Sequence, residues 1–174
     1  MDINIRNETT ADVPAIEAVT AAAFLTAPHT NHAEQFIVQA LRNAGTLVIS
    51  LVAEAEGDVV GHVAVSPVSI SDGTSGWYGL GPISVAPAYQ GQWVGSCLMR
   101  AALLALRARG AHGCVVLGEP GYYGRFGFVA EPSLVLPGVP PEYFQALAFS
   151  SALPCGSHME QHSRYRGQDN APSL

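Results

Sequence analysis

The apolar residues in the first part of the chain form one strand pattern followed by two helical patterns. Ile3-Asn4-Ile5-Arg6 alternates between apolar and polar residues, as a half-buried β-strand does. Thr9-Thr10-Ala11-Asp12 then offers capping side chains to a helix predicted over Val13 to Phe24. After a polar loop over residues 26–32, the apolar residues from Ala33 to Ala44 share one helical face. The chain is therefore predicted to open with a strand and two helices.

The middle of the chain is predicted to form three antiparallel strands. Leu47 to Glu56 and Val59 to Ile70 are rich in apolar and β-branched residues, and a turn at Gly57 separates them. Trp77 to Val85 is the third strand, and it should end before Pro87 because proline cannot donate a hydrogen bond to a sheet.

A glycine-containing turn joins the third of these strands to a helix. The helix is predicted from Val94 to Gly110, where apolar residues recur at helical spacing. Because it is entered through Gly91 and Gly95, its first backbone N–H groups and the positive end of its dipole favour a phosphate or pyrophosphate. The glycine spacing fits neither a P-loop nor a dinucleotide-binding fingerprint. The pattern alone also describes turns that bind nothing.

The last third of the chain supplies further strands and a polar end. Cys114 to Gly118 is a continuous apolar run flanked by glycines, as is typical of a buried strand. Leu134 to Pro137 and Tyr143 to Phe149 are predicted to complete the sheet. We predict one domain over residues 1–153, followed by a polar, flexible carboxyl-terminal tail over residues 154–174.

The composition fits a folded domain and narrows the choice of partners. Of the 174 residues, 48% are hydrophobic and 13% are charged, so the chain can bury a substantial core. The net charge of −6 argues against a nucleic acid or an anionic membrane as partner, and it suits a cationic amine. The sequence shows no membrane-spanning run and no signal-peptide pattern, so a cytoplasmic location is the default expectation.

The spacing of the cysteines and histidines predicts neither a disulfide framework nor a metal site. Cys97, Cys114 and Cys155 are odd in number and far apart. His29-x-x-His32 is by itself poor evidence for a metal site. We expect no metal cofactor.

Two stretches resemble motifs of one enzyme family. Between Ser84 and Ser96, Gln90-x-x-x-x-Gly95 follows Val-x-Pro, which resembles motif A of the GNAT superfamily of N-acetyltransferases. In that family Arg/Gln-x-x-Gly-x-Gly/Ala wraps the pyrophosphate of acetyl-coenzyme A. Glu119 to Phe128 resembles the Tyr-x-x-x-Gly-Phe of GNAT motif B, and the whole string looks like the YhbS-like branch of small bacterial acetyltransferases.

The resemblance implies a fold, a cosubstrate and a set of contacts. The fold is α/β (α+β type), the GNAT fold: a mixed, mostly antiparallel central sheet of about six to seven strands with helices on both faces. Acetyl-coenzyme A is the cosubstrate, and its pantetheine arm pairs with strand backbone in a V-shaped gap of the sheet. The residues implied to bind it are Ile83, Ser84, Val85, Gln90, Gly91, Gln92, Trp93, Val94, Gly95, Ser96, Tyr122 and Phe126.

Trp93 is the one departure from motif A, because it stands where the family has glycine. A side chain there restricts the backbone if the local φ is positive. In one interpretation the indole turns to solvent or lies along the cosubstrate, and the N–H groups of Val94, Gly95 and Ser96 still point inward. In the other, the site is weakened or lost, and the chain is a non-catalytic binding module that acts through protein contacts.

The chemistry that the resemblance implies is direct acetyl transfer to a primary amine of a small molecule or a peptide, through a tetrahedral intermediate. Tyr123 matches the family's general acid, although an aromatic here also suits core packing. Glu119 is nominated as general base, with His62 as the alternative; either also fits a purely structural role. His29 and His32 lie where the family builds one wall of the acceptor site, and they either contact substrate or are solvated. A homodimer is the default assembly.

Overall fold

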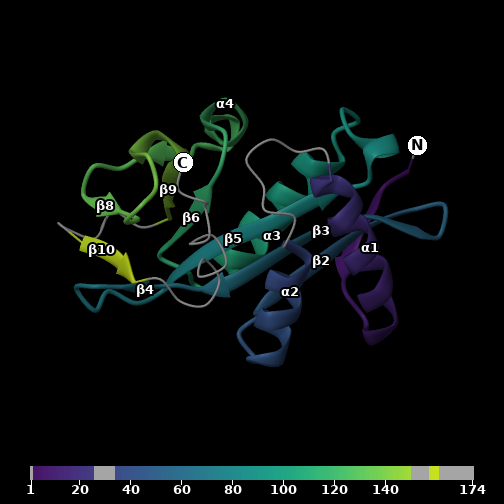
Figure 1. The fold of residues 1–174 in the computed structure, drawn as a ribbon, viewed down its shortest axis with the longest axis horizontal. Helices are drawn as coiled ribbons and strands as arrows, with labels where there is room; N and C mark the ends of the chain where they lie inside the picture. The colour runs from purple at the N-terminus through teal and green to yellow at the C-terminus, as the bar shows by residue number, and fades with distance from the viewer. Residues whose placement is uncertain (1, 26–33, 150–156, 161–174) are drawn as a thin grey trace, which may run out of the picture.

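The computed structural model describes residues 2–25, 34–149 and 157–160, and it is built on a seven-stranded sheet (Figure 1). The strand order is β1-β2-β3-β5-β6-β9-β7, and all pairs are antiparallel except β5 with β6. The strands are β1 (Asn4–Asn7), β2 (Ile49–Ala55), β3 (Asp58–Pro67), β5 (Trp77–Val85), β6 (Gly113–Leu117), β9 (Phe144–Ala148) and β7 (Val129–Ala130). The expected mixed, mostly antiparallel sheet is confirmed.

Helices cover both faces of this sheet. They are α1 (Val13–Phe24), α2 (Glu34–Asn43), α3 (Val94–Ala108) and the short α4 (Pro120–Tyr123), with 3-10 turns η1 (Thr10–Asp12), η2 (Pro87–Tyr89), η3 (Gly124–Phe126) and η4 (Pro141–Tyr143). Neighbouring strand residues point to opposite faces. Val52 and Ala64 pack with α1 and α2, whereas Ala53 and Val63 pack with α3. Within the described residues no helix is long and apolar enough to cross a membrane.

Two of the predicted strands need correction. The run predicted from Val59 to Ile70 is divided in two: β3 ends at Pro67, and Ser69–Ile70 pairs with a different strand instead of with β5. Leu134 to Pro137 does not complete the central sheet; part of it joins a second, three-stranded sheet of order β4-β10-β8. The strands of that sheet are β4 (Ser69–Ile70), β10 (Ser157–Glu160) and β8 (Leu134–Val135). The other predicted strand, over Tyr143 to Phe149, is confirmed as β9.

Strand β10 lies within the segment predicted as a polar tail. The backbone of Ser157 pairs with Leu134, and that of Met159 pairs with Ile70. The remainder of residues 154–174 falls outside the described residues. The domain boundary after residue 153 therefore stays a prediction.

Trp77 is buried where the central sheet meets the small one. It packs with Ile70, Val115 and Leu134 in a second apolar core. Its ring also lies on Gly113, its partner in the parallel β5–β6 ladder. A β-carbon at Gly113 would overlap three atoms of that ring, so the position accepts only glycine without a shift of the indole.

We predict that Gly113→Ala destabilises the fold by about 1–3 kcal/mol, because the added methyl group overpacks a rigid ring. Urea unfolding measures the change. Gly124→Ala is the matched control, since a β-carbon there meets nothing within 4 Å and its φ of −55° suits any residue. The control should change the free energy of unfolding by less than about 1 kcal/mol. Equal effects of the two substitutions would contradict the packing argument.

Candidate functional site

The turn between β5 and α3 is fixed by its own backbone and by two glutamine side chains. Gly91 and Trp93 both adopt the left-handed conformation, with φ of 73° and 67°. Gln90 Nε2 donates to the Val85 carbonyl at 3.0 Å, and Gln92 Nε2 donates to another carbonyl of the same turn at 2.9 Å. These bonds hold the chain in its curved path up to the first residue of α3. The turn is therefore preorganised by contacts within the protein.

Trp93 keeps its side chain out of this turn. A left-handed conformation costs a residue other than glycine about 1–2 kcal/mol, and 69% of the Trp93 surface is exposed. The first helical hydrogen bond runs from the Cys97 N–H to the Trp93 carbonyl at 2.9 Å. The N–H groups of Val94, Gly95 and Ser96 therefore have no acceptor within the helix. They form the donor end of α3.

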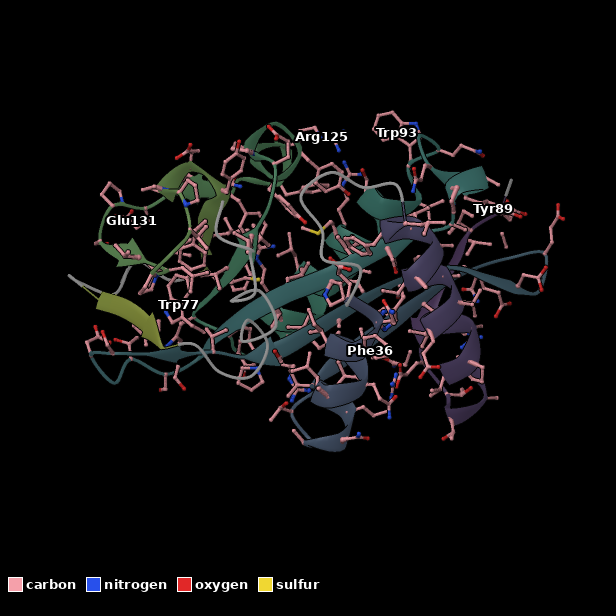
Figure 2. All side chains as sticks on the ribbon, in the orientation of Figure 1. Phe36, Trp77, Tyr89, Trp93, Arg125 and Glu131 are labelled. Atoms are coloured by element: carbon pink, nitrogen blue, oxygen red, sulfur yellow. The ribbon has the colours of Figure 1, made fainter. Side chains whose placement is uncertain are left out.

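A cavity of about 370 Å³ lies in front of these donors. Its lining residues are Val85, Tyr89, Gln90, Gly91, Trp93, Val94, Gly95, Ser96, Tyr122 and Arg125. All of them except Tyr89 and Arg125 belong to the set implied by the family resemblance. Figure 2 shows Arg125, Trp93 and Tyr89 along one rim of the molecule. The sequence does contain local signals for these two residues. Tyr89 precedes Gln90, and Arg125 follows Tyr122 at helical spacing.

Tyr122 and its neighbours form the wall opposite α3. A β-carbon at Gly95 would lie 2.8 Å from the Tyr122 hydroxyl, so glycine lets the phenol approach the start of the helix. Burial raises the pKa of Tyr122, although the positive charge of Arg125 opposes that effect. The Arg125 guanidinium lies 4.6 Å from the centre of the Tyr122 ring, and the Phe126 ring lies 5.5 Å from it. Tyr122 is therefore a neutral hydrogen-bond donor at neutral pH.

Strand β5 has a free edge beside this cavity. It pairs with β6 only over Trp77 to Gly79, after which the two strands diverge (Figure 1). From Ile83 to Val85 the edge that faces away from β3 has no partner strand in the described part of the chain. The Ser84 hydroxyl lies 3.1 Å from that of Thr20 and is buried, while Ile83 flanks it. This stretch therefore offers backbone groups rather than polar side chains.

Tyr123 and Glu119, the nominated catalytic residues, are not among the residues that line the cavity. The Tyr123 ring packs 5.0 Å from that of Tyr122 and 6.1 Å from that of Phe128, and it lies against Gly118. Glu119 is exposed at the start of α4, where its carbonyl accepts the Tyr122 N–H at 3.0 Å and the Tyr123 N–H at 3.2 Å. Their catalytic roles stay predictions.

His29 and His32, the nominated substrate contacts, lie outside the described residues. Their role also stays a prediction. Among the residues that are described, no three His, Cys, Asp or Glu side chains are grouped so that they could hold a metal ion.

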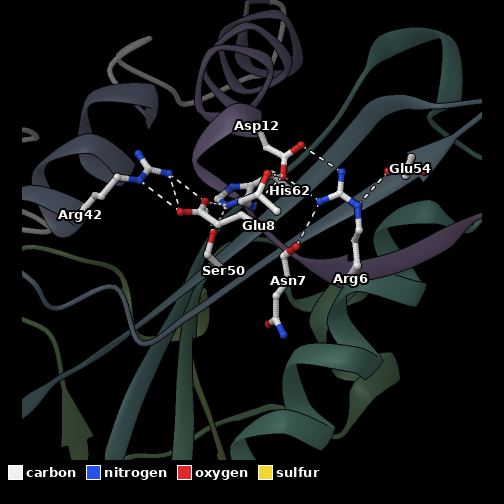
Figure 3. A network of polar contacts seen from close by, with 9 residues as sticks. Arg6, Asn7, Glu8, Asp12, Arg42, Ser50, Glu54 and His62 are labelled. Atoms are coloured by element: carbon white, nitrogen blue, oxygen red, sulfur yellow. Dashed lines mark hydrogen bonds and ion pairs between the residues drawn. The ribbon is translucent and has the colours of Figure 1, made fainter.

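His62, the alternative base, is fully buried beneath α1 and α2. Its Nε2 lies 2.7 Å from Ser50 Oγ, and the same hydroxyl donates to Glu8 (Figure 3). Arg42 forms an ion pair with Glu8 at 2.8 Å. His62 Nδ1 has no hydrogen-bond partner in the described structure. This cluster joins the end of β1 to α2 and to the sheet, and it gives His62 no direct access to a substrate.

The environment of His62 keeps its imidazole neutral. Burial lowers the pKa of His62 to about 4, an effect that Glu8 opposes and Arg42 reinforces. Burial raises the pKa of the Glu8 carboxyl, but hydrogen bonds from Arg42 and Ser50 outweigh burial and hold that pKa below its ordinary value. Glu8 is therefore charged and His62 is neutral at pH 7.

Comparison with family models and curated proteins gives a consistent result. Residues 47–130 match the model of a GNAT acetyltransferase domain. The chain is 38% identical over 125 residues to the uncharacterized N-acetyltransferase YhbS of Escherichia coli strain K12, a match that spans 71% of this chain and 72% of that protein.

Solved structures resemble this one over nearly the whole chain. A GNAT family acetyltransferase from Brucella melitensis, solved in complex with acetyl-CoA, superposes with a TM-score of 0.83 at 46% identity, covering 94% of this chain and 98% of that one. Escherichia coli YhbS, solved in complex with CoA, gives a TM-score of 0.82 at 32% identity, covering 94% of this chain and 91% of that one.

The buried His62 generates a prediction about acid stability. Between pH 6.5 and about 4 the unfolded chain binds a proton on His62 that the folded chain does not. The free energy of unfolding should therefore fall as the pH is lowered through this window, by up to about 3 kcal/mol. His62→Gln should flatten the slope, whereas replacement of the exposed His112 by Gln should not. Urea unfolding across this pH range measures it, and an unchanged slope in His62→Gln would contradict the assignment.

Proposed function

The chain belongs to the GNAT family of N-acetyltransferases, and we propose that it transfers the acetyl group of acetyl-coenzyme A to a primary amine of a small molecule or a peptide. The observation that carries the proposal is the cavity in front of α3, where the N–H groups of residues 94–96 and the helix dipole meet a preorganised turn. The solved complexes of similar proteins with acetyl-CoA and CoA support it.

The residues around the cavity suit the parts of this cosubstrate. The donors of Val94, Gly95 and Ser96 would hold the pyrophosphate, with the Gly91 turn curved around it. The free backbone edge at Ile83 to Val85 would pair with the amides of the pantetheine arm. The thioester would then lie in the gap where β5 and β6 diverge. Polar side chains are not required for this part of the binding.

The position of Trp93 favours an enzyme over the alternative of a disabled binding module. That alternative requires the indole to obstruct the turn, but the side chain is 69% exposed and the three N–H groups behind it remain unbonded within the helix. The turn therefore retains its donors despite the departure from the family motif.

The proposed reaction is a direct attack. The uncharged amine nitrogen forms a bond to the thioester carbonyl carbon, and collapse of the tetrahedral intermediate breaks the carbon–sulfur bond. Tyr123 would donate a proton to the departing thiolate, and its ring is held for this by packing against Tyr122 and Phe128. Glu119, exposed at the start of α4, would accept the proton of the amine directly or through water.

The acceptor is proposed to be a cationic amine. The net charge of −6 attracts a protonated amine to the protein surface. Loss of its proton to a carboxylate then generates the nucleophile.

We predict that calorimetric titration with acetyl-coenzyme A gives a micromolar dissociation constant. At a ligand concentration about 100 times that constant, the fold should gain about 2.7 kcal/mol and melt at a higher temperature. Release of free thiol with a panel of primary amines should follow. A native chain that shows neither heat of binding nor a shift in melting would refute the proposed function.

Tyr123→Phe should lower kcat by about 100-fold, the range expected for a general acid, while the dissociation constant of acetyl-coenzyme A stays nearly the same. Steady-state kinetics and calorimetry separate the two effects. Tyr143→Phe is the matched control, because Tyr143 is an exposed tyrosine that lies outside the cavity. If Tyr123→Phe turns over as fast as the control, Tyr123 is structural.

A further inference from the structure

The conformation and exposure of Trp93 fit a residue that contacts a ligand better than one that stabilises the fold. Its backbone occupies a left-handed position, with φ of 67°, that glycine would adopt with less strain. Its indole is 69% exposed, so it contributes little to the core, yet it lines the cavity in front of α3. Backbone strain and an exposed aromatic surface at a cavity together suggest a ligand contact.

Arg125 faces the same cavity from the other wall and is the charged residue among those lining it in the described structure. Its Nε donates to the Tyr122 carbonyl at 3.3 Å, and its guanidinium lies 4.6 Å from the Tyr122 ring and 5.7 Å from that of Phe126. These contacts fix the plane of the group. No carboxylate pairs with it in the described residues, although Arg6 and Arg42 both have carboxylate partners.

The chemistry of the cavity points to an anionic nucleotide. The start of α3 and Arg125 both contribute positive charge, so the cavity repels the cationic amine that the protein is proposed to accept. In a chain of net charge −6, a polyanion such as coenzyme A needs a local positive field. An exposed indole next to a phosphate site offers a face on which a purine can stack.

We propose that Trp93 and Arg125 clamp the nucleotide end of coenzyme A. Adenine stacks on the Trp93 indole, and Arg125 pairs with the pyrophosphate from the wall opposite the α3 donors. This proposal rests on the proposed function, since it concerns the same cosubstrate. It gives the departure at position 93 a role, and it gives one to Arg125, a residue of the motif B stretch to which the resemblance assigned no contact.

Calorimetry with two ligands tests the clamp. Acetyl-coenzyme A carries adenosine and the pyrophosphate, whereas S-acetyl-4′-phosphopantetheine carries the same thioester arm and one phosphate but no adenosine. Trp93→Gly should weaken binding of acetyl-coenzyme A about tenfold and leave S-acetyl-4′-phosphopantetheine unchanged. Trp93→Phe, which retains an aromatic face, should keep most of the affinity.

Arg125→Ala should weaken binding of both ligands, by about tenfold for acetyl-coenzyme A, and should reduce the dependence of that binding on salt. Arg109→Ala and Phe36→Ala are the matched controls. They remove an exposed arginine at the far end of α3 and an exposed aromatic of α2, neither of which lines the cavity. Both should bind as the native chain does.

Tryptophan fluorescence gives a second readout. The chain has two tryptophans, and Trp77 is buried in the core, so stacking should quench the exposed one when acetyl-coenzyme A is added. Trp93→Phe should lose that quenching while it still binds. The melting temperature of Trp93→Gly without ligand, expected to equal or exceed that of the native chain, shows that the variant is folded.

Four results would overturn the clamp. Tighter binding by Trp93→Gly would mean that the indole obstructs the turn. Equal weakening of both ligands by Trp93→Gly would mean that the substitution acts through the turn and not through adenine. If the native chain binds acetyl-coenzyme A and neither Trp93→Gly nor Arg125→Ala changes the affinity, the clamp alone is refuted. If the native chain binds neither ligand, the proposed function is refuted as well.

Discussion

The site depends on the short pairing between β5 and β6. The two strands share only three residue pairs, so they have separated before the segment from Ile83 to Val85, which has no partner strand on that side in the described part of the chain. Backbone N–H and C=O groups that lack a strand partner need another hydrogen-bond partner, and a ligand that enters the gap can supply one. The same divergence leaves room for the turn into α3 on one side and for α4 on the other (Figure 1). The topology thus creates a polar cleft before any catalytic side chain is considered.

The features that the sequence predicts well are the local ones. Helices α1 to α3 and the hairpin of β2 and β3 follow from periodicity within each segment, and the turn into α3 follows from Gly91 and Gly95. The small second sheet was missed because two-residue strands such as β4 and β8 have no period, and β10 reaches them from far along the chain. Arg125 was missed for a related reason: its spacing from Tyr122 is a local signal, but only the tertiary packing of α4 and η3 brings it to the same cavity as Trp93.

The buried polar cluster shows the same limit in another form. In the sequence His62 is one polar residue in an apolar strand. That pattern is compatible with two roles, a catalytic base and a buried structural imidazole. In the structure the imidazole is fully buried, and Ser50 and Glu8, distant in sequence, supply its hydrogen bond and a nearby charge, which favours the structural interpretation. Arg42 compensates the charge of Glu8, because a partly buried carboxylate without a partner would be destabilising. Polar contacts thus help to seat α2 on the sheet, alongside the apolar packing of Val38.

A site built from backbone donors depends on side chains less than a sequence motif suggests. Every residue except proline supplies an N–H, so the start of α3 keeps its three donors whichever side chain precedes it. Glycine at position 93 would remove about 1–2 kcal/mol of left-handed strain without adding a donor. The glycine of the motif is the residue that adopts the left-handed conformation with least strain. Another residue at that position is compatible with the same anion site provided that its side chain does not cover the N–H donors. The Trp93 indole is 69% exposed and lines the cavity, so it forms part of the wall around the donors.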